Sequence, residues 1–177
     1  MYKNTNTGFT LLELLMALAI AAILVSLAAP SFANIIKDNR LTTQYNELLA
    51  SLSLARSEAI KRAIPVTVCK SNDQITTPSC GGRWHDGWLV YIDIDGDGNL
   101  DSSDGDELIR THSTLPANNT LIFPKNRITF QANALAAGFN GTFTLCDDRG
   151  DSDSKGLIVS ITGRARKAIS SDVIGSC

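Results

Sequence analysis

The longest apolar stretch of the chain runs from Gly8 to Ile36 and contains one charged residue, Glu13. It is long enough to cross the hydrocarbon core of a bilayer, which takes about 20 apolar residues in a helix. A carboxylate inside such a segment is costly unless another group pairs with it, so Glu13 is a candidate functional residue. The alternative is a secretory signal peptide, for which Ser26-Leu27-Ala28 could serve as the small-x-small cleavage site. The length of the run, its acid and the helical sequence after it favour a membrane-spanning helix.

A helical pattern continues beyond Pro30. Apolar residues recur there at steps of three and four, the spacing of one helix face: Phe32, Ile35, Ile36, Leu41, Tyr45, Leu48, Leu49, Leu52, Ala55, Ala59 and Ile60. Pro30 can kink or locally unwind the helix, and Pro65 predicts its end at about Ile64. A helix from Phe9 to Ile64 would be roughly 80 Å long at about 1.5 Å per residue. Its first half is therefore expected in a membrane or a fibre core, and its second half against the rest of the chain.

The remaining sequence contains short apolar runs separated by turns rich in Gly, Asn and Asp, which is typical of β-strands. The expected strands are Val66–Cys69, Trp88–Ile92, Leu108–Arg110, Leu121–Phe123, Ile128–Phe130, Thr142–Cys146 and Gly156–Ile161. Residues 71–82 and 133–140 are expected to be loops. One long helix followed by strands predicts an α+β fold, in which antiparallel sheets cover the apolar face of the helix.

Net charge and sequence motifs limit the functions that the protein can have. The 177 residues carry a net charge of −2, so nucleic-acid binding would need a local cluster of cations. The sequence has no nucleophile elbow, Walker loop or zinc-protease motif, which indicates that the protein is not an enzyme. Trp84 and Trp88 are expected in the core. His85 and His112 are expected to be isolated surface residues or residues with satisfied hydrogen bonds.

The four cysteines, Cys69, Cys80, Cys146 and Cys177, all follow the apolar segment. Behind an export signal, an even number of cysteines suggests disulfides in an oxidising compartment, and their spacing matches no zinc pattern. Four cysteines allow three pairings, and the sequence alone does not choose among them. We favour Cys69–Cys80, which closes a local loop, and Cys146–Cys177, which pins an end of the chain that would otherwise fray.

An acidic segment from Asp93 to Asp104 has the spacing of a calcium loop. Its candidate ligands are Asp93, Asp95, Asp97 and Asp101, with Asp104 at the twelfth position, where an EF-hand has glutamate. The flanking segments are expected to be strands rather than helices, which favours a solvated acidic turn. Calcium is kept as the alternative, and no other cofactor is expected.

A basic segment, Gly163-Arg164-Ala165-Arg166-Lys167, follows the last expected strand. In an extended backbone Arg164 and Arg166 project from the same face. Guanidinium forks fit phosphate oxygens, and such contacts bind nucleic acid without reading its sequence. Arg149 and Lys155 would extend the patch, although four aspartates lie among them. The alternatives are an ordinary charged strand edge that discourages aggregation and a common Gly-Arg turn.

The N-terminal residues Gly8-Phe9-Thr10-Leu11-Leu12-Glu13 resemble the class III signal of type IV pilins and type II secretion pseudopilins. The resemblance implies that a prepilin peptidase cuts after Gly8 and methylates Phe9. In a filament, the Phe9 amine of one subunit would pair with Glu13 of a neighbour, which fixes the axial register more than it adds stability.

The same resemblance implies a division of the chain into three parts. Residues 1–8 are a cleaved leader, and residues 9–36 are the transmembrane or filament-core half of the helix. Residues 37–177 are a soluble pilin domain that includes the other half. The protein is then expected to cross the bacterial inner membrane once, with this domain in the periplasm, before it enters a pilus or pseudopilus.

Two further stretches make the resemblance more specific. Residues 54–62, Leu-Ala-Arg-Ser-Glu-Ala-Ile-Lys-Arg, and the pattern Trp84-x-x-Gly87-Trp88 are similar to minor pilins and pseudopilins of the GspH/FimT family. This match covers nearly the whole chain and implies a pilin-like fold, with a long helix followed by two β-sheets.

The Gly-Arg-x-Arg pattern at the C-terminal end resembles the motif of FimT-type minor pilins that capture DNA during natural transformation. It implies DNA binding by Gly163, Arg164, Arg166 and Lys167. The alternative is a structural or priming minor pilin, or a type II secretion pseudopilin, that binds no DNA. The partners implied are other pilin subunits through the N-terminal helix, prepilin peptidase, the inner membrane and the DNA phosphate backbone.

Overall fold

The structure is a computed structural model that describes residues 8–73, 75–116, 119–169, 172 and 176–177. The chain divides into two compact units, Met1–Asn39 and Arg40–Cys177. The helix α1 (Leu11–Arg62) begins in the first unit and ends in the second. The division into leader, membrane segment and soluble domain stays a prediction.

Both ends of α1 differ slightly from the expected ones. The helix begins at Leu11 rather than Phe9, because the hydroxyl oxygen of Thr10 accepts a hydrogen bond from the amide of Glu13 at 3.3 Å and caps the first turn. It ends at Arg62 rather than Ile64, because Ala63 has left-handed backbone geometry with a φ of 57°. The helix passes through Pro30 as continuous α-helix, so this proline does not unwind it.

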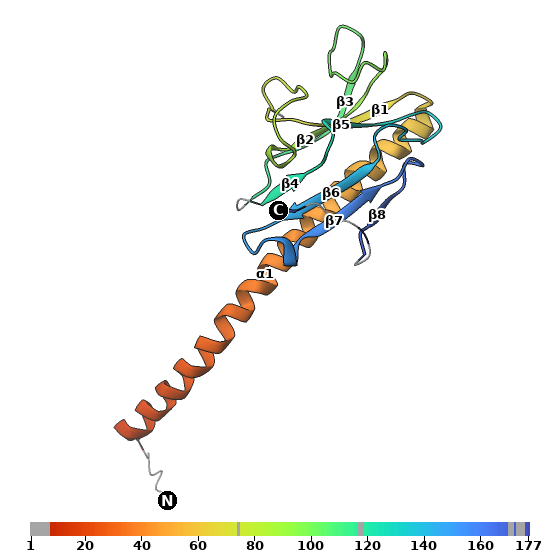
Figure 1. Ribbon diagram of the computed structural model, residues 1–177. Helices are drawn as coiled ribbons and strands as arrows, with labels where there is room; N and C mark the ends of the chain where they lie inside the picture. Colours follow the sequence, from red (N-terminus) through yellow and green to blue (C-terminus); the bar gives the residue numbers. More distant parts are fainter. Residues whose placement is uncertain (1–7, 74, 117–118, 170–171, 173–175) are drawn as a thin grey trace, which may run out of the picture. The chain divides into compact units, whose positions relative to one another are not determined.

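Two four-stranded antiparallel sheets follow α1 (Figure 1). The first has the order β3-β2-β1-β5 and consists of β1 (Val66–Lys70), β2 (Trp88–Ile92), β3 (Glu107–His112) and β5 (Arg127–Phe130). The second has the order β4-β6-β7-β8 and consists of β4 (Thr120–Ile122), β6 (Gly141–Cys146), β7 (Lys155–Val159) and β8 (Ala165–Lys167). Short 3-10 turns lie at Trp84–Asp86 and Asp151–Asp153. The predicted fold class is confirmed.

The last part of the second sheet differs from the prediction. The strand expected over residues 156–161 ends at Val159, since Ser160 begins a turn in which its carbonyl oxygen accepts a hydrogen bond from the amide of Gly163 at 2.9 Å. The chain then returns as β8, a strand that the sequence did not predict. In the ladder Arg166 lies opposite Ile158. We call residues 160–167 the basic hairpin.

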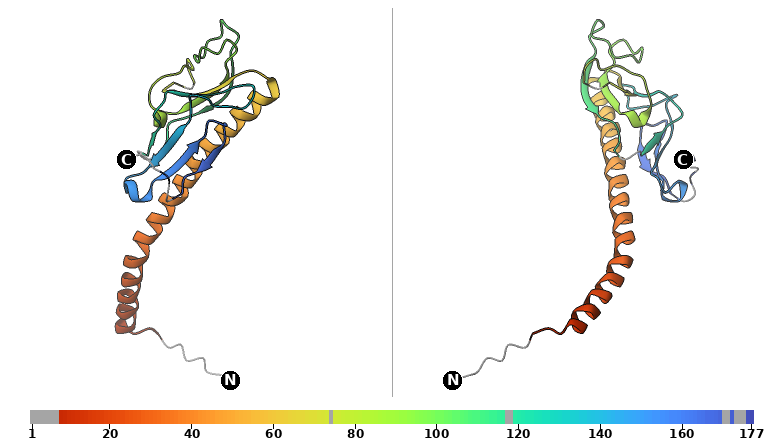
Figure 2. Two further views of the ribbon diagram at one scale, coloured as in Figure 1. Left: turned by 45° about the vertical axis from the view of Figure 1, so that its right-hand side comes forward. Right: turned by 90° about the vertical axis from the view of Figure 1, so that its left-hand side faces the viewer.

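One hydrophobic core joins the second half of α1 to both sheets. Leu48 and Leu52 of the helix share this core with Val90 of β2 and with Phe143 and Leu157 of the second sheet, and none of these is more than 3% exposed. Figures 1 and 2 show β6, β7 and β8 alongside the orange-to-yellow part of α1. Each fully buried side chain of this kind stabilises the fold by about 1.5–3 kcal/mol.

The outer face of the first sheet carries a second, smaller cluster of Cys69, Leu89 and Tyr91. Cys80 and Leu100, from the loops that follow β1 and β2, pack against it. The strand β2 is therefore buried on both faces, which explains why its sequence is apolar throughout instead of alternating.

The two tryptophans lie in the core, as predicted. Trp88 is completely buried, donates a hydrogen bond to the hydroxyl of Ser51 at 3.0 Å and stacks on His112 with ring centroids 3.8 Å apart. Trp84 is 3% exposed and donates to the carbonyl oxygen of Lys125 at 2.8 Å. His112 also lies 3.0 Å from a carboxylate oxygen of Glu47, so it joins β3 to α1.

The structure contains the disulfides Cys69–Cys80 and Cys146–Cys177, which is the pairing that we favoured from the sequence. Their Cα atoms are 5.6 Å and 5.9 Å apart, within the usual range. The first joins β1 to the loop that follows it. The second holds Cys177 beside the end of β6 and encloses the basic hairpin in a covalent loop.

The end of α1 yields a stability prediction. Replacing Ala63 by glycine should increase the free energy of unfolding by about 0.5–1 kcal/mol, because the left-handed conformation costs a Cβ-bearing residue more than glycine loses in chain entropy. The matched control is Ala50→Gly, at an exposed position inside the same helix. It should decrease stability by about 0.5–1 kcal/mol. Denaturant unfolding of the full chain in detergent micelles measures both, and equal signs would contradict the assigned geometry.

Candidate functional site

The first candidate site is the N-terminal segment, of which the structure describes residues from Gly8 onward. Gly8 and Phe9 precede α1 in non-helical backbone, and the Phe9 side chain is 79% exposed. Glu13 lies in the first helical turn, where the helix dipole favours a negative charge. Its carboxylate has no hydrogen-bond or ion-pair partner within the described residues.

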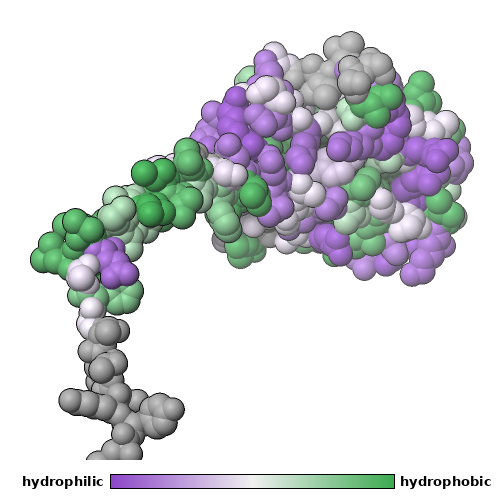
Figure 3. Space-filling model, turned by 90° about the horizontal axis from the view of Figure 1, so that it is seen from below, coloured by the Kyte–Doolittle hydropathy of each residue, from purple (hydrophilic) through white to green (hydrophobic). Residues whose placement is uncertain are grey.

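The large apolar residues that follow, from Leu11 to Ile36, are exposed. Side chains such as Leu12, Leu18 and Val25 are between 58% and 68% exposed. By length and composition α1 can cross a membrane: its most apolar window has a mean hydropathy of 2.6 and is not covered by the rest of the chain. Figure 3 shows apolar residues in green over the visible face of this segment. Such a surface needs lipid or other apolar helices around it.

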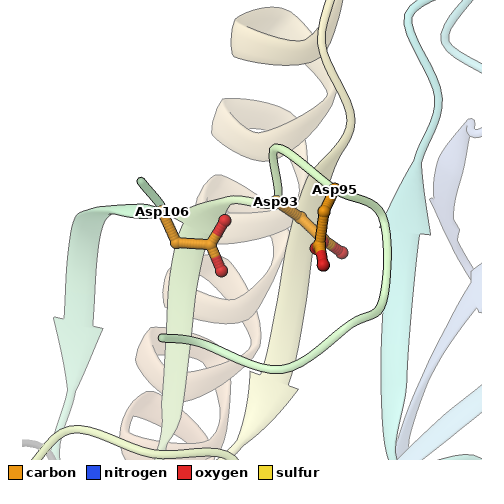
Figure 4. Close-up of side chains that lie close together, drawn as sticks. All are labelled: Asp93, Asp95 and Asp106. Atoms are coloured by element: carbon orange, nitrogen blue, oxygen red, sulfur yellow. The ribbon is translucent and has the colours of Figure 1, made fainter. Parts of the chain in front are cut away.

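The second candidate site is the acidic loop between β2 and β3. The carboxylates that approach one another, with oxygen atoms within 4.8 Å, belong to Asp93, Asp95 and Asp106 (Figure 4). Asp106 was not among the ligands expected from the spacing. Asp97, Asp101 and Asp104, which were, do not join this group among the described residues.

Most of these carboxylates accept hydrogen bonds from groups in the loop or beside it. Asp93 accepts from the Thr67 hydroxyl at 2.8 Å and from the amide of Gly98 at 3.3 Å. Asp106 accepts from two backbone amides, at 2.9 Å and 3.3 Å. Asp97 and Asp101 accept from residues two positions further on. These are the contacts of an Asx-rich turn, and calcium at this loop stays a prediction of the spacing.

The third candidate site is the basic hairpin, whose turn depends on Gly163. This glycine has a φ of 71°, and an added Cβ would lie 2.0 Å from the carbonyl oxygen of Ala134. The turn is held on that side by a hydrogen bond from the amide of Ala136 to the carbonyl oxygen of Ile161 at 2.9 Å. Gly163 therefore positions the cations after it and has no side chain with which to contact a ligand.

The three cations of the hairpin have different surroundings. Arg166 is bidentate to Asp172, with nitrogen–oxygen distances of 2.8 Å and 3.0 Å, and this ion pair lowers the pKa of Asp172 to about 2. Arg164 and Lys167 are exposed, and neither side chain has a hydrogen-bond or ion-pair partner among the described residues. Arg164 and Lys167 are therefore the cations of the hairpin that are available to a ligand.

The two cations expected to extend the patch have local partners. Arg149 forms ion pairs with Asp147 at 2.8 Å and with Asp153 at 3.4 Å. Lys155 donates to the hydroxyl of Thr42 at 2.7 Å. The structure instead brings a different cation next to the hairpin, Arg56 of α1, which was not among the residues expected in the patch.

A groove of about 240 Å³ is formed by α1 and the basic hairpin. It is lined by Leu52, Ser53, Arg56, Ser57 and Ile60 of the helix and by Gly163, Arg164 and Ala165 of the hairpin. No acidic residue lines it. Both of its charged residues are arginines, and its other polar side chains are serine hydroxyls.

Comparisons with known proteins agree with this architecture. A family model described as the type II transport protein GspH matches residues 44–163. The chain belongs to this family. A second model, the prokaryotic N-terminal methylation motif, matches residues 3–29 and implies processing by prepilin peptidase and assembly with other pilins. Among curated proteins, none matches the chain significantly.

Solved structures similar to this chain are those of minor pilins and minor pseudopilins. The type IV minor pilin FimU of Pseudomonas aeruginosa (strain PAO1) was solved in two crystal forms, and both are similar to this chain. In the first form the TM-score is 0.60 and the identity 26%, over 80% of this chain and 97% of FimU. The minor pseudopilin EpsH from the type 2 secretion system of Vibrio cholerae has a TM-score of 0.53 and 12% identity, over 75% and 99%, which shows the shared fold alone. The chain is a minor pilin or pseudopilin of the GspH family, a class of structural subunits and not of enzymes.

The acidic loop yields a prediction about pH. Burial raises the pKa of Asp93, and the hydrogen bonds from Thr67 and Gly98 only partly oppose this effect. Because the folded-state pKa lies above the unfolded value of about 3.9, the contribution of this carboxyl group to stability is fully present below the unfolded pKa and is lost as the pH rises through the folded-state pKa. In buffer with a chelator, Asp93→Asn should therefore raise the thermal midpoint by about 2–4 °C at pH 7 and leave it unchanged at pH 3.

The parent protein and the Asp93→Asn variant also test whether calcium binds the acidic loop. If calcium binds the loop, millimolar calcium raises the thermal midpoint of the parent protein and not that of the Asp93→Asn variant. A variant that is less stable than the parent at pH 7 without calcium would contradict the pKa direction assigned to Asp93.

Proposed function

We propose that this protein is a minor type IV pilin whose basic hairpin binds DNA through the phosphate backbone, for DNA uptake during natural transformation. The observation that carries the proposal is the exposed pair Arg164 and Lys167, which have no acidic partner among the described residues. Family membership and the likeness to FimU support the minor-pilin part. The DNA part rests on the hairpin and on its resemblance to FimT-type motifs.

The proposal includes a maturation route. Prepilin peptidase cuts between Gly8 and Phe9 and methylates Phe9, and residues 9–36 hold the subunit in the inner membrane with its globular domain in the periplasm. During assembly the Phe9 amine of one subunit pairs with Glu13 of another. The unpartnered Glu13 carboxylate and the exposed apolar segment around it support this step.

The hairpin suits a nucleic-acid backbone better than a base edge. Its cations are arginine and lysine, and it carries no aromatic side chain on which a base could stack. The net charge of −2 makes the rest of the chain a poor polyanion binder, so attraction must be local. Binding is therefore expected to be weak for one subunit, dependent on salt and indifferent to sequence.

The second candidate function is a structural or priming minor pilin, or a type II secretion pseudopilin, without DNA binding. One observation favours it: Asp172 neutralises Arg166, so one of the three motif cations is already occupied. The description of the matching family, a type II transport protein, fits this alternative as well.

The assembly step predicts a phenotype for Glu13. The variant Glu13→Ala should enter the membrane and fold normally but be lost from sheared filaments, because its side chain has no partner within the described chain. Immunoblots of the membrane and filament fractions measure this. The control is Ser26→Ala, another polar position of the same segment, which should assemble normally. Normal incorporation of the Glu13→Ala protein would contradict the pairing.

The hairpin predicts a ranking of DNA affinities at low salt. Arg164→Gln should weaken binding of duplex DNA about tenfold, the usual effect of losing one charge-assisted contact, and flatten the slope of log affinity against log salt by about 0.9. Arg166→Gln should cost less, since Asp172 already holds that guanidinium. Asp172→Asn should tighten binding because it frees Arg166. Fluorescence anisotropy with the full chain in neutral detergent micelles measures these affinities.

The matched control for this series is Arg110→Gln, which removes the same charge from an exposed position on β3, in the other sheet. It should change neither affinity nor slope. Equal losses from Arg110→Gln and Arg164→Gln would point to diffuse electrostatics. Absence of binding by the parent protein at low salt would leave the structural alternative as the function.

A further inference from the structure

We infer that the groove between α1 and the basic hairpin is a seat for one phosphate group, held between the guanidinium groups of Arg56 and Arg164. This inference deepens the proposed function and rests on it for the source of the phosphate, which is the backbone of DNA. It adds a residue from the helix, 108 positions away in the sequence from Arg164, to a motif that was recognised only at the C-terminal end of the chain.

The first support is an unsatisfied donor. The Nε atom of Arg56 is buried and has no hydrogen-bond partner. A buried donor without an acceptor is unfavourable, and native structures rarely leave one unless a water, an ion or a ligand completes it. An anion beside the guanidinium of Arg56 would supply the oxygen atoms that this side chain lacks.

The second support is the composition of the groove. Two arginines face a space of about 240 Å³, with the serines of α1 as the other polar side chains and no carboxylate in the lining. Neither guanidinium has an ion-pair partner among the described residues. Because a water molecule takes up about 30 Å³ in the liquid, the groove has room for a phosphate group together with several waters. Guanidinium forks are well matched to phosphate oxygens.

The third support is the way the hairpin approaches the helix. A Cβ built on Gly163 would lie 3.3 Å from Nε of Arg56 as well as against Ala134. The glycine of the motif therefore lies next to the Arg56 side chain, and Arg164, the residue after it, lines the same groove. The Gly-Arg sequence and Arg56 then form a single site built from two elements.

A stability experiment tests the seat with inorganic phosphate as the probe, using the full chain in neutral detergent micelles. Phosphate, compared with chloride at equal ionic strength, should raise the thermal midpoint of the parent and of Arg110→Gln by about 2–4 °C at concentrations well above its dissociation constant. The variants Arg56→Met and Arg164→Gln should show no such rise. Methionine keeps the aliphatic packing of Arg56 and removes an unsatisfied donor, so its midpoint without phosphate should match or exceed that of the parent.

Measurements of DNA binding distinguish a failure of the phosphate seat from a failure of the proposed function. In the anisotropy assay Arg56→Met should weaken duplex binding about tenfold, as Arg164→Gln does. If DNA binding needs Arg164 but not Arg56, the seat is wrong and the proposed function stands. If phosphate binds through both arginines but DNA does not bind, the seat stands and the proposed function fails.

Two further outcomes are decisive. Binding of phosphatidylglycerol vesicles, but not of DNA, that depends on Arg56 would assign the phosphate to lipid and overturn the nucleic-acid source. An Arg56→Met variant that is less stable than the parent yet responds to phosphate as the parent does would show that Arg56 only packs the helix, and would overturn the seat.

Discussion

The packing of both sheets on one face of α1 is the interaction on which the rest of the globular unit depends. Leu48, Leu52 and Ala55 of the helix are nearly or completely buried, and the strands contribute the other half of the same core. This packing decides what lies next to the helix. The second sheet ends in β8, and the basic hairpin is therefore brought against the part of α1 that carries Arg56. The groove in which we propose the phosphate site lies at this point, so its position is a consequence of the core packing.

The first half of α1 follows a different constraint, because its large apolar side chains from Leu11 to Ile36 are exposed. The hydrophobic effect then favours lipid or neighbouring helices around this segment, and the methylation motif and family membership agree with such an environment. The proposed assembly step and the proposed ligand site therefore lie in separate parts of the sequence. A change in the hairpin is not expected to disturb filament entry, nor a change at Glu13 to disturb the core.

Much of the fold could be predicted because its signals are local. The periodic apolar residues after Pro30 predicted the helix, and the β-branched and aromatic runs predicted the strands up to β7. The end of the helix was missed because Ala63 adopts a conformation that is typical of glycine. The strand β8 was missed because three residues, two of them charged, carry little strand signal. Arg56 and Asp106 were missed because their neighbours at the candidate sites are distant in sequence and only the tertiary fold brings them close. Asp172 was missed because its ion pair with Arg166 lies in a segment without a regular pattern.

The central claim is that Arg56 and Arg164 form one phosphate site. The most direct measurement is an NMR titration that follows the side-chain Nε–H signals of the arginines while duplex DNA is added to the full chain in micelles at low salt. The account predicts that the signals of Arg56 and Arg164 move together, with the same concentration dependence. Those of Arg62 and Arg149, which are held by Glu58 and Asp147, should stay in place. Equal movement of all four signals, or movement of Arg164 without Arg56, would contradict it.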